Sequence, residues 1–289
     1  MTNVLITGVG GQVGRGLVRT APPEMALLSC SHKDLDISDA AAVLTYVRAH
    51  MPAVIINAAA HTAVDRAESE AELARRANSE GPLHLAAAAR EVGARLIHIS
   101  TDFVFDGAAS SPYRPDAATN PLSVYGKTKL AGEQAVLEVL PERSVVLRTA
   151  WVYDAQGNNF MRTMLRVMNA SVSVRVVADQ VGTPTAARAL AETLWKIVAT
   201  PDIRGIHHWT DAGVASWYDF AVAIAEEGAQ LDLVPHNAAV TPIATKDYPT
   251  PARRPPYSVL DKSSLISNGF TPVHWRKRLR DVLGELKHG

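Results

Sequence analysis

The 289-residue sequence contains a single cysteine, Cys30, and its 29 basic and 29 acidic residues leave no net charge. One cysteine excludes an internal disulfide. Balanced charge without long runs of one sign argues against a nucleic-acid-binding protein. No apolar run approaches the ~20 residues that a membrane span requires, and no basic leader precedes the first apolar segment. We therefore expect a cytoplasmic protein that binds neither nucleic acid nor membrane.

Strands and helices are predicted to alternate along the first half of the chain. Short runs rich in Val, Leu and Ile are typical of buried parallel strands. Repeated βαβ units predict an α/β fold, a Rossmann-type doubly wound parallel sheet. The expected strands are 4–6, 25–29, 53–56, 95–100 and 144–149, and the expected helices are 39–50 and 71–92, the latter interrupted at Gly81–Pro82.

A glycine-rich turn follows the first expected strand. Gly8, Gly11 and Gly14 form a GxxGxxG pattern between that strand and apolar residues at helical spacing. Glycines permit a tight turn and bring the backbone close to a pyrophosphate at a helix N-terminus. An ordinary glycine-rich turn is the alternative, but the strand–turn–helix context favours dinucleotide binding. The cofactor-binding candidates in this turn are Gly8, Gly10, Gly11, Gln12 and Val13.

Residues after the second strand should lie near the adenosine ribose of the cofactor. An acidic residue commonly binds the 2′-hydroxyl of NAD there, whereas this chain has Ser31, His32 and Lys33, followed by Asp36 and Ile37. A cation at that place favours a 2′-phosphate, so we expect NADPH, with NADH possible; a solvated surface lysine is the alternative. Small residues after the third strand are also expected to lie along the cofactor: Asn57, Ala58, Ala59 and Ala60.

Tyr125 and Lys129 are spaced by about one helical turn and should share one face of a helix. A phenol has an ordinary pKa near ~10, and a neighbouring cation lowers that pKa toward useful acid–base work. An isolated YxxxK pattern is more often an incidental pair on an exposed helix. Here it accompanies the glycine turn. His98, within an apolar strand, is interpreted as a packed core histidine.

The chain is expected to divide near residue 150. Beyond that point the pattern loosens and proline and glycine become denser. We expect an NAD(P)-binding Rossmann domain over 1–150 and a smaller, mainly substrate-binding C-terminal domain over 151–289. A helix over 186–199 is expected to return to the first domain.

Together with Asn57-Ala58-Ala59 and Ser100-Thr101-Asp102, these motifs resemble the extended short-chain dehydrogenase/reductase superfamily. Several longer phrases are closer still to the dTDP-4-dehydrorhamnose reductases. They occur in family order over nearly the whole chain: HTAVDRAE from His61, ISTDFVFDG from Ile99, YGKTKLAGE from Tyr125, RTAWVY from Arg148, GNNFMRTML from Gly157, DQVGTPT from Asp179 and RRPPYSVLD from Arg253.

The resemblance implies an NADPH-dependent oxidoreductase that reduces dTDP-4-dehydrorhamnose to dTDP-L-rhamnose for cell-surface polysaccharide biosynthesis. It implies that Tyr125 protonates the 4-keto oxygen, that Lys129 lowers the tyrosine pKa and holds the nicotinamide ribose, and that Thr101 hydrogen-bonds the same oxygen. Taken alone, Thr101 is equally a strand-end cap. Related 4,6-dehydratases carry glutamate at the position of Phe103, which cannot exchange a proton. Dehydration is therefore disfavoured, while epimerisation stays open.

A dTDP-sugar substrate needs apolar, hydrogen-bonding and cationic partners. Trp151 offers a stacking face, the pair Asn158–Asn159 offers amides, and the pair Arg253–Arg254 offers charge for phosphate. Each has a structural alternative: a core tryptophan, a turn, or solvated arginines. The substrate-binding candidates are Thr101, Asp102, Phe103, Trp151, Asn159 and Arg253.

Two departures from the family pattern bear on metal and substrate binding. Some family members are dimers bridged by magnesium, with a glutamate that aligns with Gly16; glycine offers no ligand, so magnesium is doubtful and the protein is expected to be a monomer or homodimer. Tyr257 stands where the family often has asparagine. Two other functions stay open: reduction of another nucleotide-linked 4-keto-6-deoxy sugar, and a non-catalytic regulatory subunit resembling the methionine adenosyltransferase beta subunit.

Overall fold

The computed structural model describes residues 1–171 and 173–288. Its central layer is a six-stranded sheet in the order β10-β5-β4-β3-β1-β2, in which every neighbouring pair is parallel. The predicted doubly wound parallel sheet is confirmed. The strands are β1 (Thr2–Thr7), β2 (Met25–Cys30), β3 (Val54–Asn57), β4 (Arg95–Thr101), β5 (Ser144–Thr149) and β10 (Gly205–His208).

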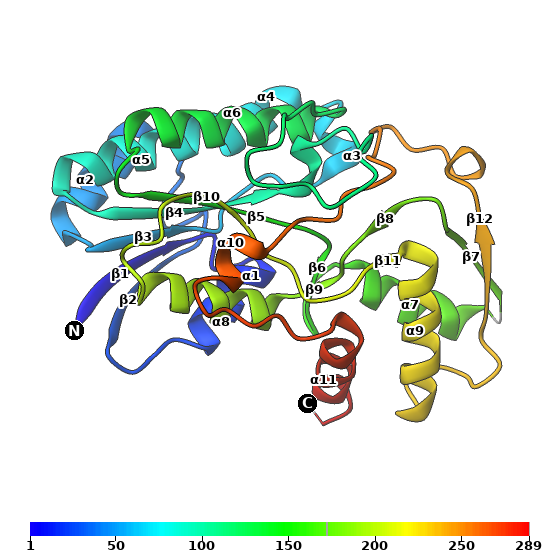
Figure 1. Ribbon diagram of the computed structural model, residues 1–289. Helices are drawn as coiled ribbons and strands as arrows, with labels where there is room; N and C mark the ends of the chain where they lie inside the picture. Colours follow the sequence, from blue (N-terminus) through cyan, green and yellow to red (C-terminus); the bar gives the residue numbers. More distant parts are fainter. Residues whose placement is uncertain (172, 289) are drawn as a thin grey trace.

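Helices cover both faces of this sheet (Figure 1). One face carries α2 (Ala40–His50), α5 (Gly81–Val92) and α6 (Val124–Val139), and the other carries α1 (Gln12–Arg19) and α8 (Ala187–Val198). Because side chains alternate along a strand, Leu5 packs into the first helical layer while Val4 and Ile6 pack into the second. Burial on both faces explains why the strands are almost continuously apolar.

A smaller body, built mostly from the second half of the chain, lies beside the sheet (Figure 1). Its own core contains Phe220, Met161 and Leu279, all fully buried. Its main elements are α7 (Phe160–Ala170), β7 (Ser173–Val177), α9 (Trp217–Gln230), β12 (Ala239–Ile243) and α11 (Trp275–His288), with β12 parallel to β7. Short strands connect it to the sheet: β6 (Val152–Tyr153), β8 (Val181–Gly182), β9 (Thr185–Ala186) and β11 (Ala215–Ser216).

The expected division of the chain near residue 150 stays a prediction. After β6 the chain comes back to the sheet twice. Leu190 and Leu194 of α8 belong to the same core as β1, and β10 pairs with β5 at the edge. Strand 205–208 was missed by the sequence interpretation, because its Gly-Ile-His-His run lacks an apolar pattern.

The helix expected over 71–92 was predicted to be interrupted at Gly81–Pro82. The irregular part instead lies just before Gly81. α4 (Ala71–Arg75) passes into a π-helical turn, η1 (Arg76–Glu80), and α5 then includes both Gly81 and Pro82. Proline fits there because the first turn of a helix needs no backbone donor at that position.

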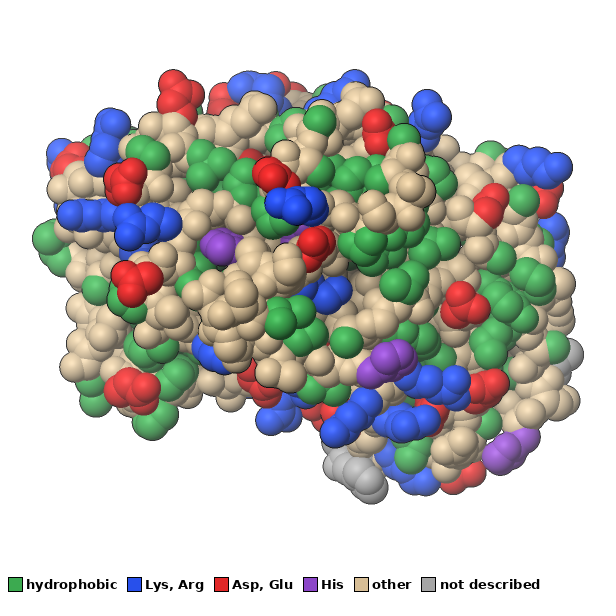
Figure 2. All heavy atoms as spheres, in the orientation of Figure 1, with side chains coloured by type: hydrophobic (Ala, Val, Ile, Leu, Met, Phe, Trp, Pro, Cys, Tyr) green, Lys and Arg blue, Asp and Glu red, His purple; other side chains and the backbone are tan. Residues whose placement is uncertain are grey.

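Among the described residues no helix is long and apolar enough to cross a membrane. Figure 2 shows acidic and basic side chains interspersed over most of the displayed face.

Gly16 lies where α1 crosses α8. A Cβ atom at this position would lie 3.1 Å from the carbonyl oxygen of Ala187 and 3.2 Å from the Cβ of Ala191. Glycine thus serves close helix packing. Within 1–171 and 173–288, no group of three or more His, Cys, Asp or Glu side chains could hold a metal ion. Gly16 therefore does not fit the magnesium site that the resemblance implies, and the expectation about magnesium stays a prediction.

We expect Gly16→Leu to destabilise the protein. The side chain has no room between the helices, and overpacking of this kind costs about 1–3 kcal/mol of the free energy of unfolding. Gly284→Leu is the matched control, because a Cβ at Gly284 of α11 meets nothing within 4 Å. Denaturant unfolding should show a lower midpoint for the first variant only. Equal midpoints would show that α1 and α8 can separate without cost.

Candidate active site

Two neighbouring cavities open at the carboxyl ends of the parallel strands, where ligands bind in sheets of this type. The first, here called the glycine groove, has a volume of about 560 Å³, and the second, here called the tyrosine cavity, has a volume of about 450 Å³. Both are lined by Gly11, Ala58 and Ala60, so they form one continuous cleft. Their sizes are those of cofactor and small-ligand sites.

The glycine groove owes its shape to close backbone contacts. Gly8 has φ of 75°, and a Cβ there would lie 2.6 Å from the backbone of Ala59; a Cβ at Gly14 would lie 2.3 Å from the Gly8 oxygen. Only glycine fits at both positions. The structure brings most cofactor candidates of the turn and of the loop after β3 to this groove or the adjoining cavity: Gly8, Gly10, Gly11, Gln12, Val13, Ala58, Ala59 and Ala60.

Asn57 lies beneath this loop and is buried. Its Oδ1 accepts hydrogen bonds from the Thr7 hydroxyl (2.8 Å) and the Ala59 backbone N–H (3.1 Å). The candidate Asn57 therefore shapes the loop from below, outside the residues that line the groove.

The ribose end of the groove contains a cation that sequence reasoning missed. His32, Asp36 and Ile37 line it as expected, while Lys33 is exposed outside it. The Ser31 hydroxyl instead donates to Asp34 Oδ2 (2.6 Å). Arg76 of η1 lines the groove and donates to the Ser38 hydroxyl (2.9 Å). Proximity in sequence pointed to Lys33, whereas the fold brings a distant arginine to this end.

Tyr125, Lys129 and Thr101 all line the tyrosine cavity, as the resemblance implied. Ser123 caps α6, with its hydroxyl accepting from the Gly126 N–H at 3.2 Å. A Cβ at Gly126 would lie 2.2 Å from the Phe103 carbonyl oxygen. Glycine therefore lets the first turn of α6 approach the end of β4, which brings tyrosine and threonine into one cavity.

Thr101 also caps the turn that follows β4, and its catalytic role stays a prediction. The turn η2 (Asp102–Val104) begins with the Phe103 N–H donating to the Thr101 hydroxyl (3.2 Å), and that hydroxyl donates to Asp102 Oδ1 (3.0 Å). Asp102 and Phe103 line the cavity as well. Burial raises the pKa of Asp102 to about 6, opposed by hydrogen bonds from Ser258 and Thr101.

The lowering of the Tyr125 pKa by Lys129 that the resemblance implied stays a prediction, because burial sets the net direction of the shift. Burial raises the pKa of Tyr125 to about 12, opposed by a hydrogen bond with Thr101. Burial also lowers the pKa of Lys129 to about 8, opposed by the charge of Glu133. The lysine Nζ donates to the Ile99 carbonyl oxygen (2.7 Å) and lies 3.4 Å from Nε2 of His98.

Trp151 lines the cavity together with Trp217, the first residue of α9. Their rings are stacked, with centroids 3.5 Å apart and an interplanar angle of 5°. Trp151 has φ of 49°, and a Cβ at Gly182 would lie 2.7 Å from its ring. The packing fixes the indole at the cavity wall. Sequence reasoning missed Trp217 because no motif marked it.

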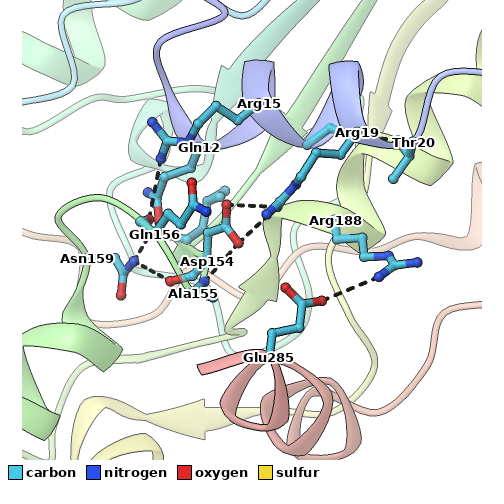
Figure 3. Close-up of polar contacts among 12 residues, drawn as sticks. Gln12, Arg15, Arg19, Thr20, Asp154, Ala155, Gln156, Asn159, Arg188 and Glu285 are labelled. Atoms are coloured by element: carbon cyan, nitrogen blue, oxygen red, sulfur yellow. Dashed lines mark hydrogen bonds and ion pairs between the residues drawn. The ribbon is translucent and has the colours of Figure 1, made fainter. Parts of the chain in front are cut away.

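Asn159, a predicted substrate residue, has a structural role. Its Oδ1 caps α7 by accepting from the Arg162 N–H (3.0 Å), and its Nδ2 donates to Gln12 Oε1 and to the Asp154 carbonyl oxygen, each at 2.8 Å (Figure 3). Arg19 of α1 forms an ion pair with Asp154 at 3.0 Å in the same view. The neighbouring Asn158 lines the cavity instead.

The arginine pair divides in the same way. Arg253 is exposed and lies outside the lining of the cavity, whereas Arg254 lines it and forms an ion pair with Asp65 at 2.7 Å. The sequence could not distinguish the two, because a loop has no periodicity that tells which of two adjacent side chains points inward, and the substrate-binding role of Arg253 stays a prediction. Tyr257 packs near Tyr113, with ring centroids 6.3 Å apart, and burial raises its pKa.

A buried ion pair supports the cavity from behind. Glu133 of α6 and Arg148 of β5 are 1% and 2% exposed, and their charged groups are 2.7 Å apart. The Ser100 hydroxyl of β4 also donates to Glu133. Glu133 lies one helical turn beyond Lys129 on α6. The pair was not recognised in the sequence.

A glycine-lined nucleotide groove continuous with a cavity lined by the buried side chains of Tyr125, Thr101 and Lys129 defines an NAD(P)-dependent oxidoreductase of the short-chain dehydrogenase/reductase type. Comparison with known proteins gives the family: residues 1–288 match the model of the RmlD substrate binding domain, and the chain belongs to this family.

Its relatives are similar over nearly their full lengths. The chain is 44% identical to the dTDP-4-dehydrorhamnose reductase of Streptomyces griseus, covering 98% of this chain and 93% of that one. Among solved structures, a dTDP-4-dehydrorhamnose reductase from Clostridium acetobutylicum has a TM-score of 0.93 at 40% identity, covering 99% and 100% of the two chains. The Bacillus anthracis reductase in complex with NADP has a TM-score of 0.92 at 35% identity, covering 99% of each.

Removing Glu133 should destabilise the protein strongly. Glu133→Ala leaves the Arg148 guanidinium buried without its partner, which costs about 3–5 kcal/mol of the free energy of unfolding. The control is Asp116→Ala, which removes an exposed pair with Arg114 and should leave the unfolding midpoint unchanged. If Glu133→Ala unfolded at the parental midpoint, the buried pair would have no part in holding α6 to the sheet.

Proposed function

We propose that this protein uses NADPH to reduce the 4-keto group of dTDP-4-dehydrorhamnose (dTDP-4-dehydro-6-deoxy-L-mannose), giving dTDP-L-rhamnose. The observation that carries the proposal is that the buried side chains of Tyr125 and Thr101 meet in a cavity continuous with the glycine groove. The relatives named as dTDP-4-dehydrorhamnose reductases support the substrate, and the relative solved with NADP supports the cofactor.

The cofactor would lie along the glycine groove. The glycine turn leaves room for its pyrophosphate at the N-terminus of α1, and the small residues Ala58 to Ala60 leave room on the opposite side. His32 and Arg76 line the far end, where they would favour the 2′-phosphate of NADPH. When bound, NADPH supplies the hydride.

Tyr125 and Thr101 supply what the keto oxygen needs as hydride arrives at its carbon. Negative charge develops on that oxygen, and two hydroxyl donors stabilise it, with the Thr101 hydroxyl turning its hydrogen from Asp102 to the keto oxygen. Because burial holds the pKa of Tyr125 at about 12, the phenol keeps its proton at neutral pH and can pass it to the oxygen. The ammonium group of Lys129 stabilises the phenolate that results.

Side chains around this centre suit a nucleotide sugar. The Trp151–Trp217 stack offers an apolar wall, and Arg254 offers a cation for the diphosphate. Asp102 and Phe103 adjoin Thr101 at the place where the sugar would react. Phe103 has no exchangeable proton, so reduction is favoured over dehydration.

A second candidate is a 4-ketoreductase of another dTDP-linked sugar. The chain is 40% identical to a probable dTDP-4,6-dihydroxy-2-methyloxan-3-one 4-ketoreductase of Streptomyces antibioticus, covering 98% of this chain and 95% of that one. The cytoplasmic location and the choice between monomer and homodimer stay predictions.

The first test measures NADPH oxidation with freshly prepared dTDP-4-dehydrorhamnose. Wild-type protein should oxidise NADPH only when the sugar is present and should yield dTDP-L-rhamnose. Tyr125→Phe, which removes the acidic proton, should lower kcat by about 10²–10⁴-fold. No oxidation despite NADPH binding would favour another dTDP-sugar. If a panel of such sugars also failed, the regulatory alternative would hold.

Arg254→Met should raise the KM for the dTDP-sugar about tenfold, because a charge-assisted hydrogen bond to phosphate is lost. Arg253→Met is the matched control and should leave KM unchanged, since Arg253 is exposed outside the cavity. Asp65→Asn keeps both arginines but breaks the ion pair of Arg254. A rise in KM in Asp65→Asn equal to that in Arg254→Met would mean that Arg254 only orders its loop.

A further inference from the structure

A chain of buried polar side chains runs from the catalytic lysine into the sheet. Lys129 Nζ lies 3.4 Å from Nε2 of His98, and Nδ1 of His98 lies 3.1 Å from Nδ2 of Asn57. Asn57 Oδ1 in turn accepts from Thr7 at 2.8 Å. The four residues come from α6, β4, β3 and β1, and each is at most 2% exposed.

The orientation of the Asn57 amide is fixed by its partners. The Ala59 backbone N–H can only donate, so the Asn57 atom that receives it at 3.1 Å must be the oxygen. The amide nitrogen therefore faces Nδ1 of His98. A side-chain NH₂ group can only donate. Nδ1 of His98 must then be the acceptor.

This contact selects one tautomer of His98. Burial, reinforced by the charge of Lys129, lowers the pKa of His98 well below its ordinary value, so the ring is neutral. A neutral imidazole carries one N–H. With Nδ1 accepting from Asn57, that hydrogen is on Nε2, which is the atom that faces Lys129.

An ammonium group has three donors and no acceptor, so it cannot receive the Nε2–H of His98. The neutral amine can receive it through its lone pair and still donate to the Ile99 carbonyl oxygen at 2.7 Å. We propose that Asn57 and His98 are positioning residues that turn an N–H toward Lys129 and so favour its neutral form in the cofactor-free protein. The inference deepens the proposed reduction and rests on it.

Other titratable groups near Lys129 also affect the balance between its ammonium and neutral forms. Glu133 on the same helix favours the ammonium form, but its charge is shared with Arg148 of β5. Tyr125 on α6 keeps its proton. Asp102, at the end of β4, lines the same cavity and favours the ammonium form when it is ionised. The balance of these effects agrees with the lowering of the Lys129 pKa to about 8 by burial.

This arrangement has a consequence for the reaction. If turnover needs the lysine ammonium beside Tyr125, activity is lost as pH rises through the lysine pKa. A feature that favours the neutral amine moves this alkaline loss closer to neutral pH, and removing the feature moves it to higher pH. The tautomer of His98, together with burial, thus influences the pH at which activity is lost.

The direct test is ¹⁵N NMR of the histidine ring in the full-length, cofactor-free protein, with His98 assigned by its loss in His98→Leu. The expected signal is a neutral ring with the hydrogen on Nε2. A hydrogen on Nδ1 would overturn the proposal, because Nε2 would then accept from the ammonium group. This result does not depend on turnover, so failure of the proposed function would be seen separately in the NADPH assay.

Asn57→Asp tests the consequence. The aspartate still accepts from Thr7 and Ala59, but its second oxygen accepts from Nδ1–H and reverses the tautomer. The Lys129 side-chain NMR titration, assigned by comparison with Lys129→Arg, and the alkaline limb of kcat/KM should both move up by about one pH unit. His207→Gln, on β10 of the same sheet, is the control and should move neither.

The double variant Asn57→Asp/His98→Leu separates the tautomer from the added charge. His98→Leu alone removes the N–H and should itself raise the lysine pKa, so the double variant is compared with His98→Leu. If the tautomer carries the effect of Asn57→Asp, that substitution should add little further shift in the His98→Leu background. A full additional shift would assign the effect to the carboxylate and would overturn the proposal. Thermal unfolding of each variant shows whether it is folded, and the ring tautomer of the wild type decides the question should a variant fail to fold.

Discussion

The structure of the active site depends on how closely the first turns of α6 approach the end of β4. Gly126 makes this approach possible, since a Cβ there would lie 2.2 Å from the Phe103 oxygen, and the buried Glu133–Arg148 pair fixes the next turns against β5. A buried ion pair adds little net stability compared with apolar packing, and it offsets its desolvation cost only when its geometry is good. That geometry puts the hydroxyls of Tyr125 and Thr101 in the same cavity.

The same close approach determines the electrostatics. Bringing α6 onto the sheet excludes water from Tyr125 and Lys129, and desolvation disfavours whichever form carries charge. The tyrosine therefore becomes a weaker acid and the lysine a stronger one. At neutral pH the phenol is protonated, as a proton donor must be. Position along the sequence gives the pairing of these residues, but the direction of the tyrosine shift follows from burial, which only the fold determines.

Sequence patterns predicted the parts of the fold that repeat along the chain. Apolar runs located five of the six sheet strands, and glycine spacing located the cofactor turn, because these features are local. What the sequence could not determine was which of two adjacent loop residues faces inward, as with Arg254 and Arg253 or Asn158 and Asn159. It also could not bring distant residues together, such as Arg76 at the ribose end and Trp217 against Trp151. Those contacts depend on tertiary packing, which leaves no local periodicity.

His98 shows how a core residue and a functional residue can be the same. Its apolar neighbours along β4 predicted a packed histidine, and the side chain is fully buried. A buried imidazole still needs partners for both nitrogens, and in this sheet the available partners are the amide of Asn57 and the side chain of Lys129. Hydrogen bonding at both nitrogens of His98 thus constrains the protonation of Lys129. Buried polar groups must be hydrogen-bonded. Through Asn57, this requirement links the loop after β3, which shapes the cofactor groove, to the charge of Lys129.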